Sequence, residues 1–236
     1  MKIRNSYKTL FKGFTLFILS AAIFTACKKD DEQKPTPNTN ARVALMISSP
    51  GANELSFFVK DKKISTAPLL YNTIVNYLTV SEGAQELIFK NKDASSVVDQ
   101  LAANLKPSTS YTLIFTDQSP KTAMVLVEDD LSDPAKDKAK VRFSNLSPDA
   151  PALDLYINGK LETTFSNKNF KETSIFQNID PGTTLKFELK AHGKIEVLAT
   201  LENFHILNGK IYTIWARGLK ESTTTNKLGL EAMTNR

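Results

Sequence analysis

Two stretches of this 236-residue chain share one pattern, and together they decide the fold. Residues 139–158 read Ala-Lys-Val-Arg-Phe-Ser-Asn-Leu-Ser-Pro-Asp-Ala-Pro-Ala-Leu-Asp-Leu-Tyr-Ile-Asn, and residues 41–60 read Ala-Arg-Val-Ala-Leu-Met-Ile-Ser-Ser-Pro-Gly-Ala-Asn-Glu-Leu-Ser-Phe-Phe-Val-Lys. Further along, Tyr111-Thr-Leu matches Tyr212-Thr-Ile, so the offset drifts from 98 to 101 residues, as loop insertions would cause. The chain therefore contains an internal repeat with two copies.

Apolar and polar residues alternate with a period of two inside each copy, which is typical of strands rather than helices. Asn158-Gly159 supplies the positive φ angles of a tight hairpin, and Asp180-Pro181-Gly182 marks another turn. This spacing predicts an all-β fold of two tandem immunoglobulin-like antiparallel β-sandwich domains, with about seven to eight strands each. In the second copy the alternating positions are Val141/Phe143, Leu153/Leu155/Ile157, Leu185/Phe187/Leu189 and Ile195/Val197.

Two tyrosines indicate structural corners. Residues 105–111, Leu-Lys-Pro-Ser-Thr-Ser-Tyr, resemble the L-x-P-x-T-x-Y segment of fibronectin-type and immunoglobulin-like sandwiches, and residues 207–212 resemble it less completely. In those sandwiches the tyrosine hydroxyl bonds back to the preceding loop. We therefore expect Tyr111 and Tyr212 to hold loops rather than to contact a ligand.

The second copy also resembles a bacterial family of domains of unknown function that carries an SPDAP signature. The signature, V-R-F-x-N-x-S-P-D-A-P-x-x-D-x-Y-x-N-G, is matched by residues 141–159, whereas the first copy keeps only Ser49-Pro50 and the strand pattern. In that copy Gly51, Asn53 and Asp61 replace the family's Asp, Pro and Gly. The resemblance implies lipid-anchored or secreted β-sandwich domains, often in tandem, and it supplies no activity or ligand.

The expected domains cover residues 41–128 and 140–236, joined by a linker at 129–139 that contains four acidic residues, two lysines and a proline. The chain has 30 Lys+Arg against 25 Asp+Glu, but four of the basic residues lie within residues 1–26. Without that segment the count is 26 against 25, and neither copy carries a clustered basic face. Nucleic acid is therefore not an expected partner.

The N-terminus has the pattern of a signal peptide, expected at residues 1–26. Four basic residues precede a charge-free apolar run of 14 residues, Gly13 to Ala26, which is too short for a stable membrane span. The run ends in Phe-Thr-Ala-Cys27, which resembles the lipobox of bacterial lipoproteins, and Cys27 is the only cysteine. We expect Cys27 to be acylated and to anchor the protein in the outer membrane, the alternative being a free or buried thiol behind an ordinary signal peptide.

Residues 27–40 are expected to form a disordered tether, because they hold no apolar residue besides the prolines that could pack. The cluster that follows the cysteine resembles the surface-export signal of some Gram-negative lipoproteins; it consists of Lys28, Lys29, Asp30, Asp31 and Glu32. This pattern favours display on the cell surface over the periplasmic face.

The sequence offers little catalytic chemistry, so we expect no enzyme activity and no cofactor. His192 is predicted in an exposed turn and His205 on a strand, without a metal-binding or catalytic motif around either. Asp149 and Asp154 are weak candidates for Ca²⁺ ligands, but two carboxylates fall short of the six to eight oxygens that this ion takes. Asp149 is also expected to bond backbone N–H groups where the chain crosses between the sheets.

Binding residues are harder to locate. Trp215, in Ile211-Tyr-Thr-Ile-Trp-Ala216, lies either on an exposed face, where it could stack on a sugar ring, or in the core. Tyr71 and Tyr77 flank a less regular stretch and are candidate loop contacts. We expect a non-enzymatic binding module for a carbohydrate or a surface protein. The alternative is a structural subunit of a surface assembly, such as a lipoprotein pilin that donates an edge strand.

Overall fold

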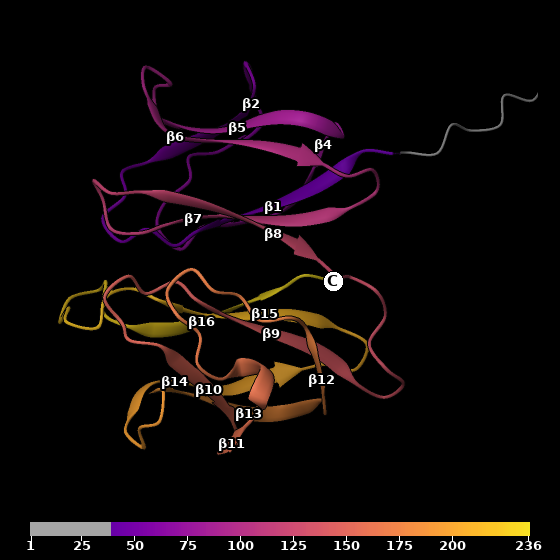
Figure 1. The fold of residues 1–236 in the computed structure, drawn as a ribbon, viewed down its shortest axis with the longest axis vertical. Helices are drawn as coiled ribbons and strands as arrows, with labels where there is room; N and C mark the ends of the chain where they lie inside the picture. Colours follow the sequence, from indigo (N-terminus) through magenta and orange to yellow (C-terminus); the bar gives the residue numbers. More distant parts are fainter. Residues whose placement is uncertain (1–38) are drawn as a thin grey trace, which may run out of the picture. The chain divides into compact units, whose positions relative to one another are not determined.

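The computed structural model describes residues 39–236, so the predictions for residues 1–38 lie outside the described part. The described residues belong to one compact unit, which contains two β-sandwiches of eight strands each. Figure 1 shows the two sheets of each sandwich lying face to face. The expected fold class, two tandem β-sandwiches, is confirmed.

The first sandwich consists of two four-stranded sheets. One has the order β4 (Ile74–Val80), β1 (Ala41–Ile47), β7 (Ser110–Thr116), β8 (Ala123–Asp129). The other has the order β3 (Lys62–Lys63), β2 (Leu55–Val59), β5 (Gly83–Asn91), β6 (Val97–Leu105).

The second sandwich repeats this topology. One sheet has the order β12 (Gln177–Ile179), β9 (Ala139–Asn145), β15 (Ile211–Arg217), β16 (Gly229–Thr234). The other has the order β11 (Lys160–Leu161), β10 (Leu153–Ile157), β13 (Gly182–Ala191), β14 (Val197–Ile206), and a short 3-10 turn, η1 (Thr163–Phe165), follows β11. All neighbouring strands are antiparallel except the pairs β1–β7 and β9–β15, which are parallel.

The local features expected from the sequence are present. Asn158 and Gly159 have φ values of 49° and 79° in the turn between β10 and β11. The Tyr111 hydroxyl accepts a hydrogen bond from the Lys106 N–H at 3.0 Å, and the Tyr212 hydroxyl accepts one from the Leu207 N–H at 3.1 Å. Both tyrosines are therefore structural corners.

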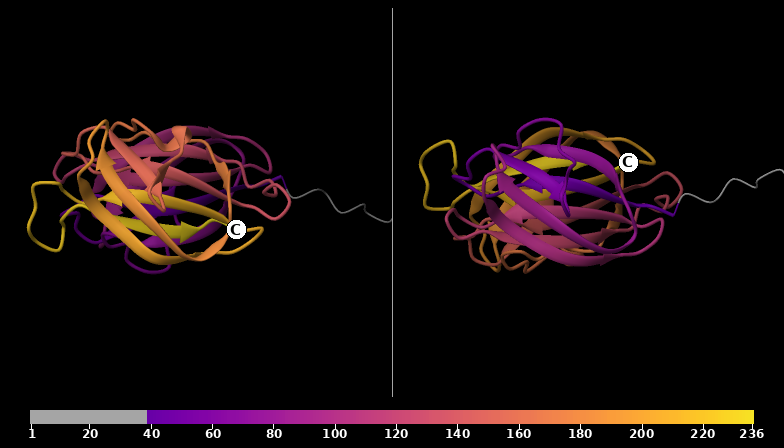
Figure 2. Two further views of the ribbon diagram at one scale, coloured as in Figure 1. Left: turned by 90° about the horizontal axis from the view of Figure 1, so that it is seen from below. Right: turned by 90° about the horizontal axis from the view of Figure 1, so that it is seen from above.

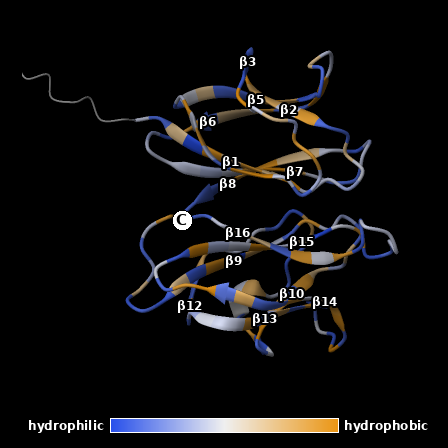
Figure 3. Ribbon diagram, turned by 180° about the vertical axis from the view of Figure 1, so that it is seen from behind, coloured by the Kyte–Doolittle hydropathy of each residue, from blue (hydrophilic) through white to orange (hydrophobic). Residues whose placement is uncertain are grey.

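The central strands are buried on both faces, which explains their almost continuous apolar sequences. Along β1, Val43 and Leu45 point into the core of the first sandwich, whereas Ala44 and Met46 point away from it. Along β15, Tyr212 and Ile214 point into the second core, and Trp215 points away. Figure 3 shows how apolar residues concentrate along β1 and β7.

These outward-pointing side chains meet in a third cluster, which joins the two sandwiches. It draws on the sheets that contain β1 and β9, and we refer to it as the interface cluster. Its buried members are Ala44, Met46, Ile114, Leu146, Trp215 and Met233. The central parts of the outer faces of these two sheets are therefore covered by the other sandwich.

A closed ring of hydrogen bonds accompanies the interface cluster. We refer to it as the polar ring; its members are Tyr77, Thr112, Asp129, Arg142, Thr213 and Asn235. Arg142 of β9 is central: Nη1 donates to Asp129 Oδ1 at 2.6 Å, Nη2 to Thr112 Oγ1 at 2.9 Å, and Nε to Thr213 Oγ1 at 2.9 Å. The side chains of Arg142 and Asp129 are 2% and 0% exposed.

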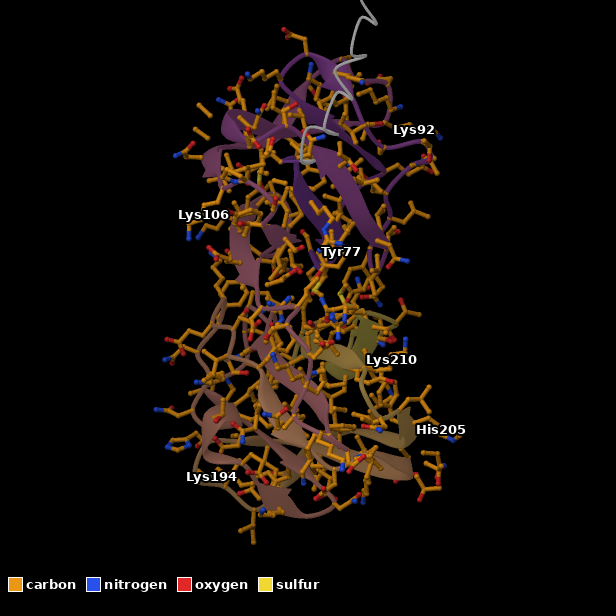
Figure 4. All side chains as sticks on the ribbon, turned by 90° about the vertical axis from the view of Figure 1, so that its right-hand side faces the viewer. Tyr77, Lys92, Lys106, Lys194, His205 and Lys210 are labelled. Atoms are coloured by element: carbon orange, nitrogen blue, oxygen red, sulfur yellow. The ribbon has the colours of Figure 1, made fainter. Side chains whose placement is uncertain are left out.

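The remaining bonds close the ring. Thr112 Oγ1 and the Tyr77 hydroxyl both donate to Asp129 Oδ2, at 2.7 and 2.6 Å. Thr213 Oγ1 donates to Asn235 Oδ1 at 2.7 Å, and Asn235 Nδ2 donates to the Tyr77 oxygen at 3.1 Å. Each side chain of the ring therefore has at least two hydrogen-bond partners within it, and the ring spans both sandwiches. Figure 4 labels Tyr77 at this junction.

Two sequence expectations need correction. Ile195 and Val197 do not form a buried alternating pair: Ile195 lies in the turn before β14 and is 94% exposed, and Val197 is 41% exposed. The strands also extend one residue further at each end of the linker, because β8 runs to Asp129 and β9 begins at Ala139. Asp129 is thus a buried strand residue and not a solvated linker acid. Within residues 39–236, the structure has no helix with the length and apolar character needed to cross a membrane.

Candidate functional site

The loops at one end of the strands come from both sandwiches and lie against one another. Asp117, which follows β7, accepts a hydrogen bond at 3.2 Å from Lys171 of the second sandwich. The described chain enters at the opposite end, where Ala41 pairs with Val80. Figure 2 shows the loop that follows β15, in yellow, at the end of the strands opposite the C-terminus. We name this end the distal loop end; its loops include residues 48–54, 70–73, 92–96, 117–122, 146–152, 166–172, 192–196 and 218–228.

A groove of about 490 Å³ lies at the distal loop end, between the two sandwiches. The first sandwich contributes the loop from Asp117 to Lys121, and the second contributes Pro148 and Asp149 of the SPDAP signature. The lining contains both signs of charge and no aromatic residue. Its chemistry suits a polar partner better than the stacking face that sugar recognition commonly uses.

Two signature side chains fix the loops of this groove. Asp149 accepts hydrogen bonds from the backbone N–H of Lys220 at 2.7 Å and of Glu221 at 3.1 Å, so it fastens the loop between β15 and β16. Asn145 donates from Nδ2 to the Lys168 carbonyl at 3.0 Å, and its Oδ1 accepts from the Ser147 N–H at 3.1 Å. The expectation that Asp149 bonds backbone N–H groups holds, but those groups belong to a loop far along the chain.

A third signature residue, Asp154 of β10, has a similar role. Its Oδ1 accepts hydrogen bonds from the Asn167 N–H at 2.7 Å and from Ser166 Oγ at 3.0 Å, and it lies 3.0 Å from Nδ1 of His192. Burial raises the pKa of Asp154, but the hydrogen bonds from Asn167, His192 and Ser166 outweigh it and leave the pKa below its usual value. His192 is therefore a partner of Asp154 and not a free side chain, which the sequence did not reveal.

The arrangement of Ser166, His192 and Asp154 does not make a nucleophile. In a catalytic triad the acid and the serine bond to different nitrogens of the histidine. Here both approach Nδ1, Asp154 at 3.0 Å and Ser166 at 3.5 Å. The imidazole therefore cannot take the serine proton while the aspartate orients it, and the cluster acts as a brace for the loop after η1.

Asp149 and Asp154 do not form a cation site. Their carboxylates already accept bonds from N–H and O–H donors, which leaves few oxygen lone pairs for a metal ion. Among residues 39–236 there is no group of three or more His, Cys, Asp or Glu side chains that could hold a metal. The weak calcium hypothesis is thus not supported by the placement of either residue.

Of the three aromatic residues suggested as ligand contacts, Trp215 and Tyr77 lie between the sandwiches, whereas Tyr71 lies at the distal loop end, beside Asn72, whose N–H donates to the Ile47 carbonyl. Trp215 is 1% exposed and belongs to the interface cluster, so of its two alternatives the buried one is observed. Tyr77 lies within β4 and belongs to the polar ring; burial, followed by the nearby Asp129 carboxylate, raises the pKa of its hydroxyl. Tyr71 lies in the turn before β4, where burial raises the pKa of its hydroxyl and the Arg217 guanidinium opposes this. Trp215 and Tyr77 are not exposed ligand contacts, because the other sandwich covers the sheet face that carries them.

The lipidation residue Cys27 and the export cluster at 28–32 lie outside the described residues. Their roles stay predictions from the sequence.

The comparison with known proteins finds a domain of unknown function, and the match lies mainly on the first copy rather than on the second, for which the resemblance was expected. Residues 41–156 match the model of a family described as "Domain of unknown function (DUF4397)". The match starts with β1 and ends within β10, so it covers the first sandwich, the linker and the signature up to Tyr156. No curated protein matches the chain. Residues 41–156 of this chain are therefore similar to the DUF4397 family.

Proposed function

We propose that this protein is an outer-membrane lipoprotein, anchored through Cys27 and displayed on the cell surface, that acts as a non-enzymatic binding module for a protein ligand. The observation that carries the proposal is the distal loop end, where loops of both sandwiches meet around one groove. It lies opposite the end at which the described chain begins.

The loops of the groove are held in place before any ligand arrives. Asp149 fastens the loop between β15 and β16 with two hydrogen bonds, and Asn145 and Asp154 both bond the loop after η1. The polar ring and the interface cluster hold the two sandwiches together. A pre-organised surface loses less conformational entropy on binding, which favours a recognition role for these loops.

The choice of a protein over a carbohydrate rests on the aromatic residues. Sugar-binding surfaces commonly offer an exposed aromatic ring, but Trp215 is buried, Tyr111 and Tyr212 are corners, and Tyr71 is half-buried. The distal loop end instead offers polar loops of mixed charge and the exposed Ile195. This combination resembles the rim and isolated apolar contacts of protein interfaces.

Site-specific photo-crosslinking on cells tests the ligand site. A benzophenone side chain at Lys121, in the groove, is expected to give a discrete adduct, and the same group at Lys210, at the opposite end of the strands, serves as the matched control. The adduct should disappear when Asp149→Ala releases the neighbouring loop. Equal adducts from both positions, or binding of the protein to a glycan array, would contradict a protein ligand at this site.

Fractionation and protease treatment of intact cells test the anchor and its side. Cys27→Ala is expected to release the protein from the membrane fraction, and external protease should digest the wild-type protein. Replacement of the acidic residues at 30–32 with alanine should protect the protein from external protease, because it would then stay on the periplasmic face. A Cys27→Ala chain that stays with the membrane would contradict the lipid anchor.

The second candidate function, a structural subunit of a surface assembly, is favoured by one specific observation. The edge strand β6 is nine residues long, and within residues 39–236 no strand pairs with its outer side.

A further inference from the structure

The strand β6 forms an open edge of the first sandwich. It is nine residues long and pairs on one side with β5, in regular register from Gly83↔Leu105 to Phe89↔Asp99. Within residues 39–236 no strand pairs with its other side, so a row of backbone N–H and C=O groups remains without a sheet partner. Figure 1 shows β6 at the border of its sheet.

This edge has few of the features that normally prevent pairing with another chain, and its one register shift against β5 lies at its start, beside Val97. Natural edge strands are guarded by charged side chains, proline, bulges or a short length. The solvent-facing residues of β6 are Val98, Gln100, Ala102 and Asn104, none of which is charged. Val97 and Val98 are 50% and 38% exposed, and the sole acid, Asp99, already accepts a hydrogen bond from Thr122 Oγ1 at 3.0 Å.

The corresponding edge in the second sandwich, β14, shows what a guarded edge of this fold looks like. It carries the charged Glu202 and the polar His205 on its exposed positions. Its pairing with β13 has three register shifts, against one between β5 and β6. Asn203 has a φ of 53°, which bends the strand. The two copies of the repeat therefore differ in this respect, and the open edge belongs to the first copy alone.

We propose that two copies of this protein pair through β6, antiparallel about a twofold axis. Full overlap of Val97–Leu105 places Val98 opposite Asn104, Gln100 opposite Ala102, and Asp99 opposite Ala103. No like charges face one another in this register, so the strand is self-complementary. The pairing joins two four-stranded sheets into one of eight strands.

A twofold pairing limits the assembly to a dimer. Each copy contributes the same strand, and both strands are used once the pair has formed, so the contact is isologous and closes at two. This differs from a pilin, in which each subunit donates one strand and accepts another to build an open fibre. The inference does not depend on the ligand proposed for the distal loop end.

Sedimentation velocity over a range of concentrations tests the proposal. The experiment can use residues 28–236, because both cores and the interface cluster lie within the compact unit. The double variant Gln100→Lys/Ala102→Lys sets two pairs of like charges opposite each other, and we expect the dissociation constant of the dimer to rise roughly tenfold. Gln100→Lys/Ala102→Glu sets opposite charges in the same places and should restore the dimer.

The matched control is Thr200→Lys, an exposed position on the guarded edge β14, which should leave the dimer unchanged. Thermal unfolding followed by circular dichroism establishes that each variant is folded; should the double-lysine variant fail to fold, the Lys/Glu variant on β6 and the control on β14 still compare the two edges. A wild-type chain that is monomeric at every concentration, oligomers larger than the dimer, or a dimer that resists the double-lysine variant would each overturn the proposal.

Discussion

Replacing Arg142 with methionine removes the centre of the polar ring and keeps a side chain of similar length. Asp129 then loses its ionic partner at 2.6 Å, and the hydroxyls of Thr112 and Thr213 each lose a donor at 2.9 Å. The Asp129 carboxylate is 0% exposed, so water does not replace the lost partner. Its Oδ2 keeps the donors from Tyr77 and Thr112.

The size of the expected stability loss follows from the burial of the Arg142–Asp129 ion pair. Removing one partner of a buried ion pair typically costs about 3–5 kcal/mol, because it leaves an uncompensated buried charge. An exposed ion pair contributes about 0–1 kcal/mol. Lys106 and Glu128 form such an exposed pair at 2.7 Å, with side chains 65% and 52% exposed. We therefore expect Arg142→Met to lower the free energy of unfolding by about 3 kcal/mol, and the control Lys106→Met by less than about 1 kcal/mol.

The assay is urea unfolding followed by two signals. Trp215 is the only tryptophan and lies in the interface cluster, so its fluorescence reports on the contact between the sandwiches. Far-UV circular dichroism reports on the strands. In the wild type the two transitions should coincide, and in Arg142→Met the fluorescence transition should come first, because the interface opens before the sandwiches unfold.

A double-mutant cycle decides whether the loss of stability comes from the broken Arg142–Asp129 ion pair. Asp129→Asn alone leaves Arg142 buried without a carboxylate and should be destabilising to a similar degree. The combined variant contains no unpaired charge, so its loss should be smaller than the sum of the two single losses by about 2 kcal/mol. Additive losses, or a loss for Arg142→Met no larger than that of the exposed control, would refute this reasoning.

Three further predictions concern the corners and the distal loops. Tyr111→Phe removes the hydroxyl that accepts a hydrogen bond from the Lys106 N–H and should lower the free energy of unfolding, measured in urea, by about 1 kcal/mol. An unchanged free energy of unfolding would contradict a stabilising role for this hydrogen bond. Asp149→Ala should speed amide hydrogen exchange at Lys220 and Glu221 while the melting temperature changes little, and unchanged exchange there would show that the loop is held by other contacts. The folded state lowers the pKa of Asp154, so its contribution to stability is present above the ordinary pKa of 3.8 and is lost as the pH falls through the lower value of the folded state. Acid unfolding of Asp154→Asn should therefore depend less on pH below about 4 than that of the wild type, and parallel curves would contradict this.

The features that the sequence predicted are those that depend on local chemistry. The period of two along residues 141–157 decides which side chains face the core, and Asn158-Gly159 decides the turn. The strand starts at Ala41 and Ala139 show that the repeat has the same boundaries in both copies. The prediction that Ile195 is a buried strand residue was wrong, because alternation in a short segment cannot distinguish the end of a strand from the turn beyond it.

The interface between the sandwiches could not be predicted in the same way. Alternation shows that Arg142 and Trp215 point away from the core of their own sandwich, but it does not show what covers them. The one available signal was that Ile211–Ala216 is apolar on both faces, which favours a buried strand but is also compatible with an exposed tryptophan. The acidic neighbours of Asp129 favour a linker, and its burial follows from partners far from it in the sequence, Tyr77, Thr112 and Arg142.

The repeat also explains why the polar ring pairs unlike sandwiches. Thr112 and Thr213 occupy equivalent positions, as do Ala44 and Arg142, and Asp129 corresponds to Asn235 because each lies across from the first residues of β7 or β15. If the outer faces of two first sandwiches met in this way, they would bury two Asp129 carboxylates beside alanines. If the outer faces of two second sandwiches met, they would bury two Arg142 guanidinium groups beside asparagines. Burial of such unpaired charges is costly, so only the unlike pair, with one Asp129 and one Arg142, is neutral and fully bonded.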